Sequence, residues 1–176
     1  MQLLSVPVPE CQRWLTALVV ANASASEGVL EQVAADLIRL GNELDWSKLE
    51  TPSAKPGEER LYLLAQAGQE GPCLYLVSDG PGVTSPAHEH STWAVIVGLR
   101  GIERNAFYEA TSHERREARC VRVRDIGIGD RAVLTEATIH ATEVIGPQAT
   151  FHLHLYGKPL HALPLFENRI FHVPAE

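Results

Sequence analysis

Histidines with the spacing of metal ligands are the most chemically informative residues of this sequence. His88 and His90 are separated by one residue, His140 follows in a later segment, and His154 precedes Tyr156 by two positions. Because strand side chains alternate between faces, a His-x-His pair sends both imidazoles to the same side. Two such imidazoles, with a third from another strand, can hold one metal ion. The spacing therefore predicts a metal site built on β-strands.

The third imidazole is expected from His140. It lies in the strand-like segment 137–143, which follows a Gly-x-Gly-Asp turn at residues 127–130. A lone histidine there would more often be an ordinary interior residue, but the His88 and His90 pair favours a ligand role. Three neutral imidazoles suit divalent iron, copper, nickel or zinc, whereas calcium and magnesium prefer oxygen ligands.

The segment 150–157 separates an apolar trio from a polar one by strict alternation. The apolar residues are Phe151, Leu153 and Leu155, and the polar residues are His152, His154 and Tyr156. We expect the polar trio to face a barrel interior. This second His-x-His could instead be the metal pair, and the spacing leaves that alternative open. A buried histidine beside a tyrosine can also orient the phenol through a hydrogen bond.

The elements that must position these residues are mostly short strands. We expect strands at residues 60–66, 73–78, 86–97, 101–108, 117–124, 131–134, 138–145, 150–156 and 168–173. Many short strands separated by Gly, Pro and Asp predict a sandwich or barrel. An alternating α/β sheet would need helical segments between these runs, and the sequence does not supply them.

The first part of the chain has a helical pattern instead. Apolar residues recur every three or four positions in two segments between residues 9 and 40, where Ser26 can cap the second helix and Gly41 can end it. Residues 47–58 indicate a connecting loop. We therefore predict a mainly β single domain over residues 1–176, with a helical cap at 1–45 and a β-barrel at 59–176.

Composition limits the classes of binding partner and the cellular location that we expect. The 176 residues carry a net charge of −7, which gives no general attraction to nucleic acid, and no run reaches the ~18 apolar residues of a membrane span. We expect small-molecule partners, neither nucleic acid nor membrane, and a monomer or homodimer. Three separated cysteines and an N-terminus unlike a secretory signal favour the cytoplasm.

Residues 82–101 resemble the first motif of the cupin superfamily. A glycine, five residues and then His-x-His precede an apolar strand and a glycine turn. The resemblance implies a double-stranded β-helix, or jelly roll. Many cupins add a glutamate four or five residues after the second histidine, and here those positions hold Ala94 and Val95. A histidine-only metal site is the consequence.

The chain more narrowly resembles the thiol dioxygenases, which include cysteine dioxygenase and 3-mercaptopropionate dioxygenase. The motifs that carry this resemblance are the N-terminal helices, His88-Glu89-His90 with Trp93 and Leu99-Arg100-Gly101, His140, and His154-Leu155-Tyr156-Gly157. The resemblance implies iron(II) held by three histidines, which correspond to His88, His90 and His140. It also implies that His154 and Tyr156 form a catalytic pair just outside the ligands. The implied reaction uses O2 to oxidise a small thiol to a sulfinate.

The chain departs from that family at three places. His152 occupies the position of a serine that begins the family's Ser-His-Tyr relay. No cysteine lies near Ala94 to form a crosslink with Tyr156. The position of the family's carboxylate-binding residue falls on Leu61, although Arg60 could serve if the register differs by one residue.

Other assignments follow from these departures. Arg60, Trp93 and His152 are candidate substrate-binding residues, with Trp93 as a wall against water. Arg100, Arg104 and Arg169 are further possible anion partners. Other functions remain open. One is a three-histidine iron dioxygenase that cleaves a carbon–carbon bond of a β-diketone or enol. Another is a cupin without catalytic activity that binds a small ligand, or a metal-dependent isomerase that needs no oxygen.

Overall fold

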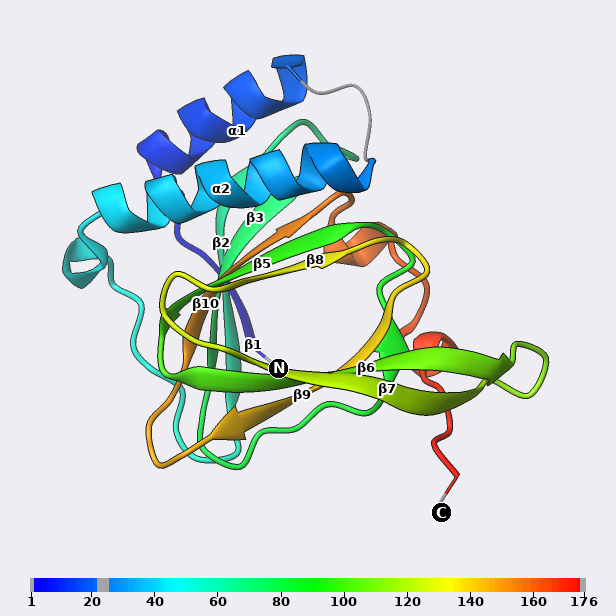
Figure 1. Ribbon diagram of the computed structural model, residues 1–176. Helices are drawn as coiled ribbons and strands as arrows, with labels where there is room; N and C mark the ends of the chain where they lie inside the picture. Colours follow the sequence, from blue (N-terminus) through cyan, green and yellow to red (C-terminus); the bar gives the residue numbers. More distant parts are fainter. Residues whose placement is uncertain (1, 22–25, 175–176) are drawn as a thin grey trace.

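The computed structural model describes residues 2–21 and 26–174, which form two helices and ten strands (Figure 1). The elements are β1 Gln2–Ser5, α1 Pro9–Ala21, α2 Glu27–Glu43, β2 Glu59–Gln66, β3 Cys73–Asp79, β4 His88–Glu89, β5 Ala94–Arg100, β6 Ile102–Ser112, β7 Glu117–Ile126, β8 Arg131–Leu134, β9 Ile139–Ile145 and β10 Phe151–Tyr156. Short 3-10 helices span Trp46–Lys48, Leu160–Ala162 and Phe166–Arg169.

The strands form two facing sheets, as expected for a jelly roll. The larger sheet has the order β1-β2-β3-β10-β5-β8, and the smaller one has the order β4-β9-β6-β7. Apart from the parallel β1–β2 pair, neighbouring strands run antiparallel. Figure 1 shows the two sheets enclosing the interior, with the β6–β7 hairpin extending beyond it. The predicted mainly β fold is confirmed.

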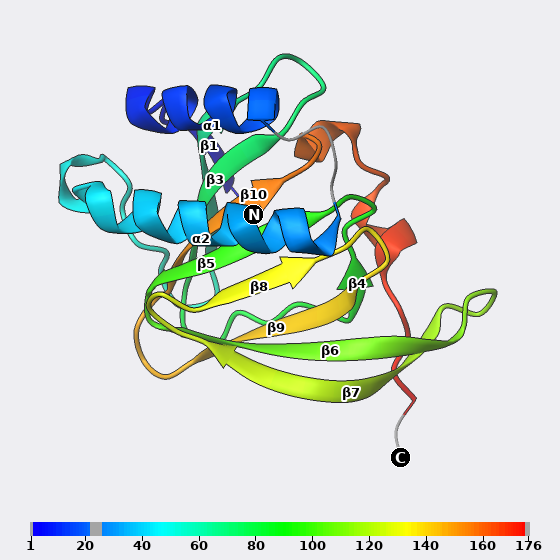
Figure 2. The ribbon, with the colours of Figure 1, turned by 45° about the horizontal axis from the view of Figure 1, so that its top comes forward.

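Both helices cover the outer face of the larger sheet (Figure 2). Residues at every third or fourth position of α2, such as Leu30, Val33 and Leu37, are buried against this sheet. Leu153 and Leu155 of β10 belong to the same cluster. The opposite face of β10 looks into the space between the sheets, so the predicted alternation along β10 is confirmed.

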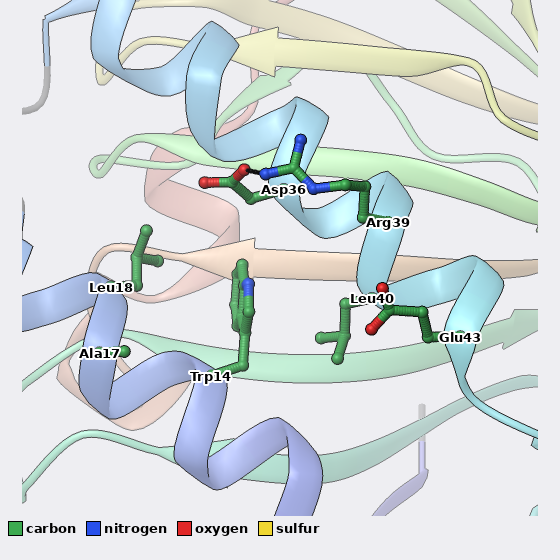
Figure 3. A pocket seen from close by; sticks show the side chains of 7 residues that line it. All are labelled: Trp14, Ala17, Leu18, Asp36, Arg39, Leu40 and Glu43. Atoms are coloured by element: carbon green, nitrogen blue, oxygen red, sulfur yellow. Dashed lines mark hydrogen bonds and ion pairs between the residues drawn. The ribbon is translucent and has the colours of Figure 1, made fainter.

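A groove on the surface lies between the two helices, with a volume of about 360 Å³. Figure 3 shows two of its borders, Trp14 of α1 and the Asp36–Arg39 ion pair of α2. Its residues belong to the helical layer, outside the barrel. None of the histidines considered above lines it.

The structure corrects four local expectations. Residues 2–5 form β1 within the expected helical cap, and they pair with β2. The strand expected at 86–97 is interrupted at Ser91, which adopts a positive φ of 56°, so β4 and β5 are separate. The range 168–173 holds part of a 3-10 helix and isolated bridges instead of a strand. Finally, α2 continues past Gly41 to Glu43.

The position of Gly41 has a packing explanation. A Cβ at this residue would lie 2.8 Å from Cδ2 of Leu99 on β5. Glycine therefore allows a close approach of helix and sheet here. In the sequence, a glycine that permits such packing looks the same as a glycine that ends a helix.

In the part of the chain that the structure describes, no helix has the length and apolar character needed to cross a membrane.

Candidate metal centre

Three histidines meet between the sheets at the inner face of the smaller one. His88 of β4 stands opposite His140 of β9 in the antiparallel register, and His90 follows β4 directly. The ring centroids of the three imidazoles are 4.8 to 5.0 Å apart, so the rings form a nearly equilateral triangle. The positive φ of Ser91 turns the chain immediately after His90. Residues from two chain segments are thereby brought to one point.

Hydrogen bonds fix which ring nitrogen each imidazole offers. Nδ1 of His88 lies 2.9 Å from the carbonyl oxygen of Pro86, and Nδ1 of His140 lies 3.0 Å from Oδ1 of Asn105. Since both partners are acceptors, each Nδ1 carries the proton and donates it. Nε2 of each ring is then left with its lone pair, which is the tautomer needed for metal binding.

The orientation of His140 depends on a buried polar chain. Asn105 receives the His140 hydrogen bond at Oδ1 and donates from Nδ2 to Oε1 of Glu103 at 2.9 Å. All three side chains are almost fully buried. Glu103 therefore fixes the amide, and the amide in turn fixes the imidazole.

The donor set fits a transition-metal ion. One ligand atom from each of His88, His90 and His140 lies within 4.8 Å of the others, and Nε2 of His90 is 2.8 Å from Nε2 of His140. Imidazole nitrogens bound at about 2.1 Å to a common ion lie roughly 3 Å apart, which agrees with this spacing. The three residues thus form a group that could hold a metal ion.

Burial keeps these imidazoles neutral. It lowers the pKa of His88, and it lowers the pKa of His90 and of His140 well below the ordinary value. Neighbouring imidazoles of the trio act in the same direction for His90 and His140. Neutral imidazoles keep the lone pairs that a metal requires and leave the charge of a divalent ion uncompensated.

His154 and Tyr156 form a hydrogen-bonded pair next to the trio. Nδ1 of His154 lies 3.0 Å from the Tyr156 hydroxyl, and the Tyr156 ring centroid is 5.1 Å from that of His90. Burial raises the pKa of Tyr156 above its ordinary value, with a further contribution from carboxylates led by Glu59. Burial also lowers the pKa of His154. The pair is therefore neutral, with a protonated phenol that can donate.

A cavity of about 350 Å³ opens onto the trio and this pair. Its lining includes the five residues described above and apolar side chains such as Leu61, Val77 and Phe166. This volume lies within the range of small-ligand sites, about 300–1,000 Å³. Imidazole nitrogens, a phenol and apolar walls thus share one small compartment.

Three carboxylates line the same cavity and were missed by the sequence reasoning. Glu59 and Asp79 stand opposite each other on β2 and β3, and Glu103 comes from β6 of the facing sheet. We call these three residues the acidic wall. Strand alternation could have revealed Glu59, because Glu59 and Leu61 lie on the same face of one strand and Leu61 was expected near the substrate.

The structure does not bring all expected substrate-binding residues to the cavity. Arg60 does not line the cavity, and its Nη2 pairs with Oε2 of Glu58 at 3.0 Å. The register of β2 against β3 is regular from Glu59 to Leu63, so no slip brings Arg60 to the cavity. Trp93 lies against Gly157, where an added Cβ would be 2.5 Å from the indole Nε1. It packs against the hydrophobic cluster that includes the helices and does not line the cavity.

His152 is also absent from the cavity lining. It is fully buried, its ring centroid is 6.2 Å from that of His154, and neither ring nitrogen has a hydrogen-bond partner in the described chain. Its side chain shares the inner face of β10 with His154 and Tyr156, as expected. A direct contact with a ligand in the cavity is not open to it in this arrangement.

The remaining arginines divide between the surface and the site's edge. Arg100 donates to Ser53, and Arg104 pairs with Asp125. Arg169 lies nearest the trio, with its guanidinium 5.2 Å from the Phe166 ring centroid. Its charge lowers the pKa of His88 and His90 as a minor contribution.

Comparisons with known proteins bear on the fold. No family model matches the sequence, and no curated protein matches it. A protein of solved structure from Thermus thermophilus shares 14% identity and a TM-score of 0.50, covering 66% of this chain and 97% of that one. A cupin superfamily protein from Desulfitobacterium hafniense shares 17% identity and a TM-score of 0.45, covering 60% and 83%.

A third similar structure is a larger enzyme. The oxalate decarboxylase of Lactobacillus farciminis, solved with formate, shares 19% identity and a TM-score of 0.42, and the match covers 51% of this chain but only 25% of that protein. The two facing sheets form a jelly roll, and the Thermus thermophilus protein shares this fold. The molecule is therefore a jelly-roll protein with a three-histidine group that could bind a metal.

Proposed function

We propose that this protein is a non-haem iron(II) dioxygenase that uses O2 to oxidise a small thiol to a sulfinate in the cytoplasm. The observation that carries the proposal is the convergence of three neutral imidazoles, without a carboxylate ligand, beside the His154–Tyr156 pair in one cavity. Three neutral ligands leave coordination positions for reactants. The resemblance of the motifs to thiol dioxygenases supports the same assignment.

The overall reaction places both atoms of O2 on the sulfur of RSH to give RSO2H. Bound by His88, His90 and His140, iron(II) would supply open positions for thiolate and O2 and would favour loss of the thiol proton. The three imidazoles would hold the ion, and the hydrogen bond from His140 to Asn105 would hold the ligand ring in place.

The chain's own groups supply orientation and a proton. Tyr156, fixed by its hydrogen bond to His154, presents a neutral phenol that can donate to an oxygen of the reactants. Leu61, Val77 and Phe166 line the cavity and limit access of water. Arg60, Trp93 and His152 do not line it and take no direct part in this assignment.

A second candidate is a dioxygenase that cleaves a carbon–carbon bond in a β-diketone or related enol. One observation favours it: among the described cavity-lining residues there is no Lys or Arg to bind a substrate carboxylate. A neutral diketone needs no such anchor. The same three histidines would serve either reaction.

The test combines metal analysis with oxygen uptake in the presence of a thiol panel and a diketone panel. His88→Ala should lose bound iron and thiol-dependent uptake, since it removes one of three ligands. Tyr156→Phe should keep iron but lower kcat by about 100-fold, as expected for loss of a proton donor. Tyr75→Phe, a buried phenol beside Tyr156, is the matched control and should stay near the wild-type rate.

Each outcome has a distinct meaning. Full activity in His88→Ala would exclude the proposed metal site. Uptake with diketones alone would support the second candidate. Iron binding with no uptake in either panel would indicate a cupin that binds a small ligand without catalysis.

A further inference from the structure

In the reaction as described so far, Glu59 and Asp79 of the acidic wall have no role, and Glu103 acts only by orienting Asn105. Glu59 and Asp79 come from adjacent strands of the larger sheet, whereas Glu103 comes from the smaller one. All three line the cavity that also contains His88, His90 and His140. The cavity therefore has an imidazole side and carboxylates on both enclosing sheets.

Asp79 provides an independent sign of a missing partner. Its side chain is 5% exposed, it lines the cavity, and its Oδ1 has no hydrogen-bond partner in the described part of the chain. Burial, together with Glu103 and Glu59, raises the pKa of Asp79 to about 8. A buried carboxylate normally has a donor or a cation beside it, because its desolvation is otherwise uncompensated.

No side-chain cation of the described residues fills this place. Among the described residues that line the cavity there is neither Lys nor Arg. Arg60, the nearest arginine in sequence, points to the other face of β2 and pairs with Glu58. The described side chains therefore leave Oδ1 of Asp79 without a partner, and a bound ligand could supply one.

The geometry suits an organic cation better than a second metal ion. Within the described ranges, the histidine trio is the only group of at least three potential ligands whose atoms converge within 4.8 Å. The carboxylates surround the space without converging on one point. A primary ammonium group carries three N–H donors, which can reach acceptors in different directions.

We propose that the acidic wall binds the protonated amine of a small aminothiol while the histidine side of the cavity receives its sulfur. This inference rests on the proposed thiol dioxygenase function and names its substrate class. A thiol bearing a carboxylate would face carboxylates on both sheets and meet like-charge repulsion. The cavity thus favours a cationic headgroup over an anionic one.

The first experiment compares three thiols of similar size on the iron-loaded protein. These are 2-aminoethanethiol, 2-mercaptoethanol and 3-mercaptopropionate, with positive, neutral and negative headgroups. We expect kcat/KM for the amine to exceed that for the carboxylate by at least about tenfold, equivalent to about 1.4 kcal/mol. Equal values, or a preference for the carboxylate, would overturn the proposal.

Variants then identify the group responsible. Asp79→Asn keeps the shape and removes the charge, so kcat/KM should fall at least about tenfold for 2-aminoethanethiol while that for 2-mercaptoethanol stays near wild type. Glu109→Gln removes an exposed charge from the same strand as Glu103 and should change neither value. Equal losses for both thiols in Asp79→Asn would contradict a role in charge recognition. If this variant does not fold, Glu59→Gln is measured in the same way.

Binding without turnover separates this proposal from the proposed function. Anaerobic calorimetry with zinc-loaded protein measures the affinity for the same three thiols. If no thiol supports oxygen uptake but the amine still binds more tightly, the dioxygenase assignment fails and the cation site stands. If thiols are oxidised but binding is indifferent to the headgroup, the dioxygenase assignment stands and the cation site fails.

Discussion

At the scale of single residues, the candidate metal centre depends on side chains outside the three histidines. Glu103 orients the Asn105 amide, and that amide orients His140 through Nδ1. The other two ligand rings are held differently, because His88 uses a backbone carbonyl and Nδ1 of His90 has no partner in the described chain. Asn105 is thus the side chain whose loss most directly frees one of the three imidazoles.

Asn105→Ala should therefore lower metal affinity by about 10- to 100-fold, the usual effect of removing such a hydrogen bond. The Zn²⁺ affinity, measured by competition with a chromophoric chelator, reports this directly. Asn168→Ala, on the exposed 3-10 helix Phe166–Arg169, is the control and should bind as the wild type does. Unchanged affinity in Asn105→Ala would mean that the amide does not hold the ring.

The sequence predicted the histidines better than it predicted their surroundings. The His88 and His90 pair is readable because strand alternation is local, and the same rule separates His154 and Tyr156 from their apolar neighbours. The hydrogen bond between Asn105 and His140 depends on the pairing of β6 with β9, which the tertiary structure sets and local sequence patterns do not show. The acidic wall likewise becomes visible only when β2, β3 and β6 face one cavity.

At the scale of elements, the end of β5 is held by a close backbone crossing. Gly98 donates from its N–H to the carbonyl of Asp130 at 3.0 Å, and its own carbonyl accepts from Gly129 at 2.9 Å. A Cβ at Gly98 would lie 2.0 Å from the carbonyl oxygen of Gly127. Because this clash involves backbone, no side-chain rotation can relieve it. The crossing ties the turn before β8 to the strand that flanks His152.

Gly98→Ala should therefore destabilise the protein by at least about 2 kcal/mol, since the added methyl must displace a packed turn. Chemical denaturation monitored by circular dichroism measures the change in the free energy of unfolding. Gly28→Ala is the matched control: it lies in α2 with nothing within 4 Å of the new Cβ, and alanine favours a helix by up to about 1 kcal/mol. A stable Gly98→Ala variant would show that the turn can move.

The accuracy of the predicted elements follows the strength of their local signals. The two helices and the strands around residues 73–78, 131–134 and 150–156 match closely, because their periodicity and flanking turns are clear. Strand β1 is short and pairs with a distant segment, so only its parallel partner β2 reveals it. The segment after residue 160 has apolar residues but folds as 3-10 turns packed at the edge of the site.

At the scale of the whole molecule, the distribution of negative charge is uneven. The chain carries a net charge of −7, and most of its charged side chains lie in contact with water. The acidic wall instead places carboxylates between the two sheets, where Asp79 and Glu103 are almost fully buried. Such groups oppose folding when ionised without a partner. The protein thus retains in its interior carboxyl groups that a jelly-roll core does not require.

This arrangement predicts how stability depends on pH in the metal-free and ligand-free protein. Burial raises the pKa of Asp79 to about 8 from an unfolded value of 3.8, so between these values the folded state binds more protons than the unfolded state. The contribution of Asp79 to stability is thus fully present below the lower value and is lost as the pH rises toward the higher one. Asp79→Asn removes this dependence.

The melting temperature of Asp79→Asn should therefore exceed that of the wild type by at least about 2 °C at pH 8, with a smaller difference at pH 5. Thermal denaturation at several pH values, with chelator present, measures the difference. Glu109→Gln on the exposed face should follow the wild-type curve throughout. A constant difference across this range would mean that Asp79 ionises as easily in the folded state as in the unfolded one. In that case, its buried position would not disfavour the charge, and a bound cation would not be needed to compensate it.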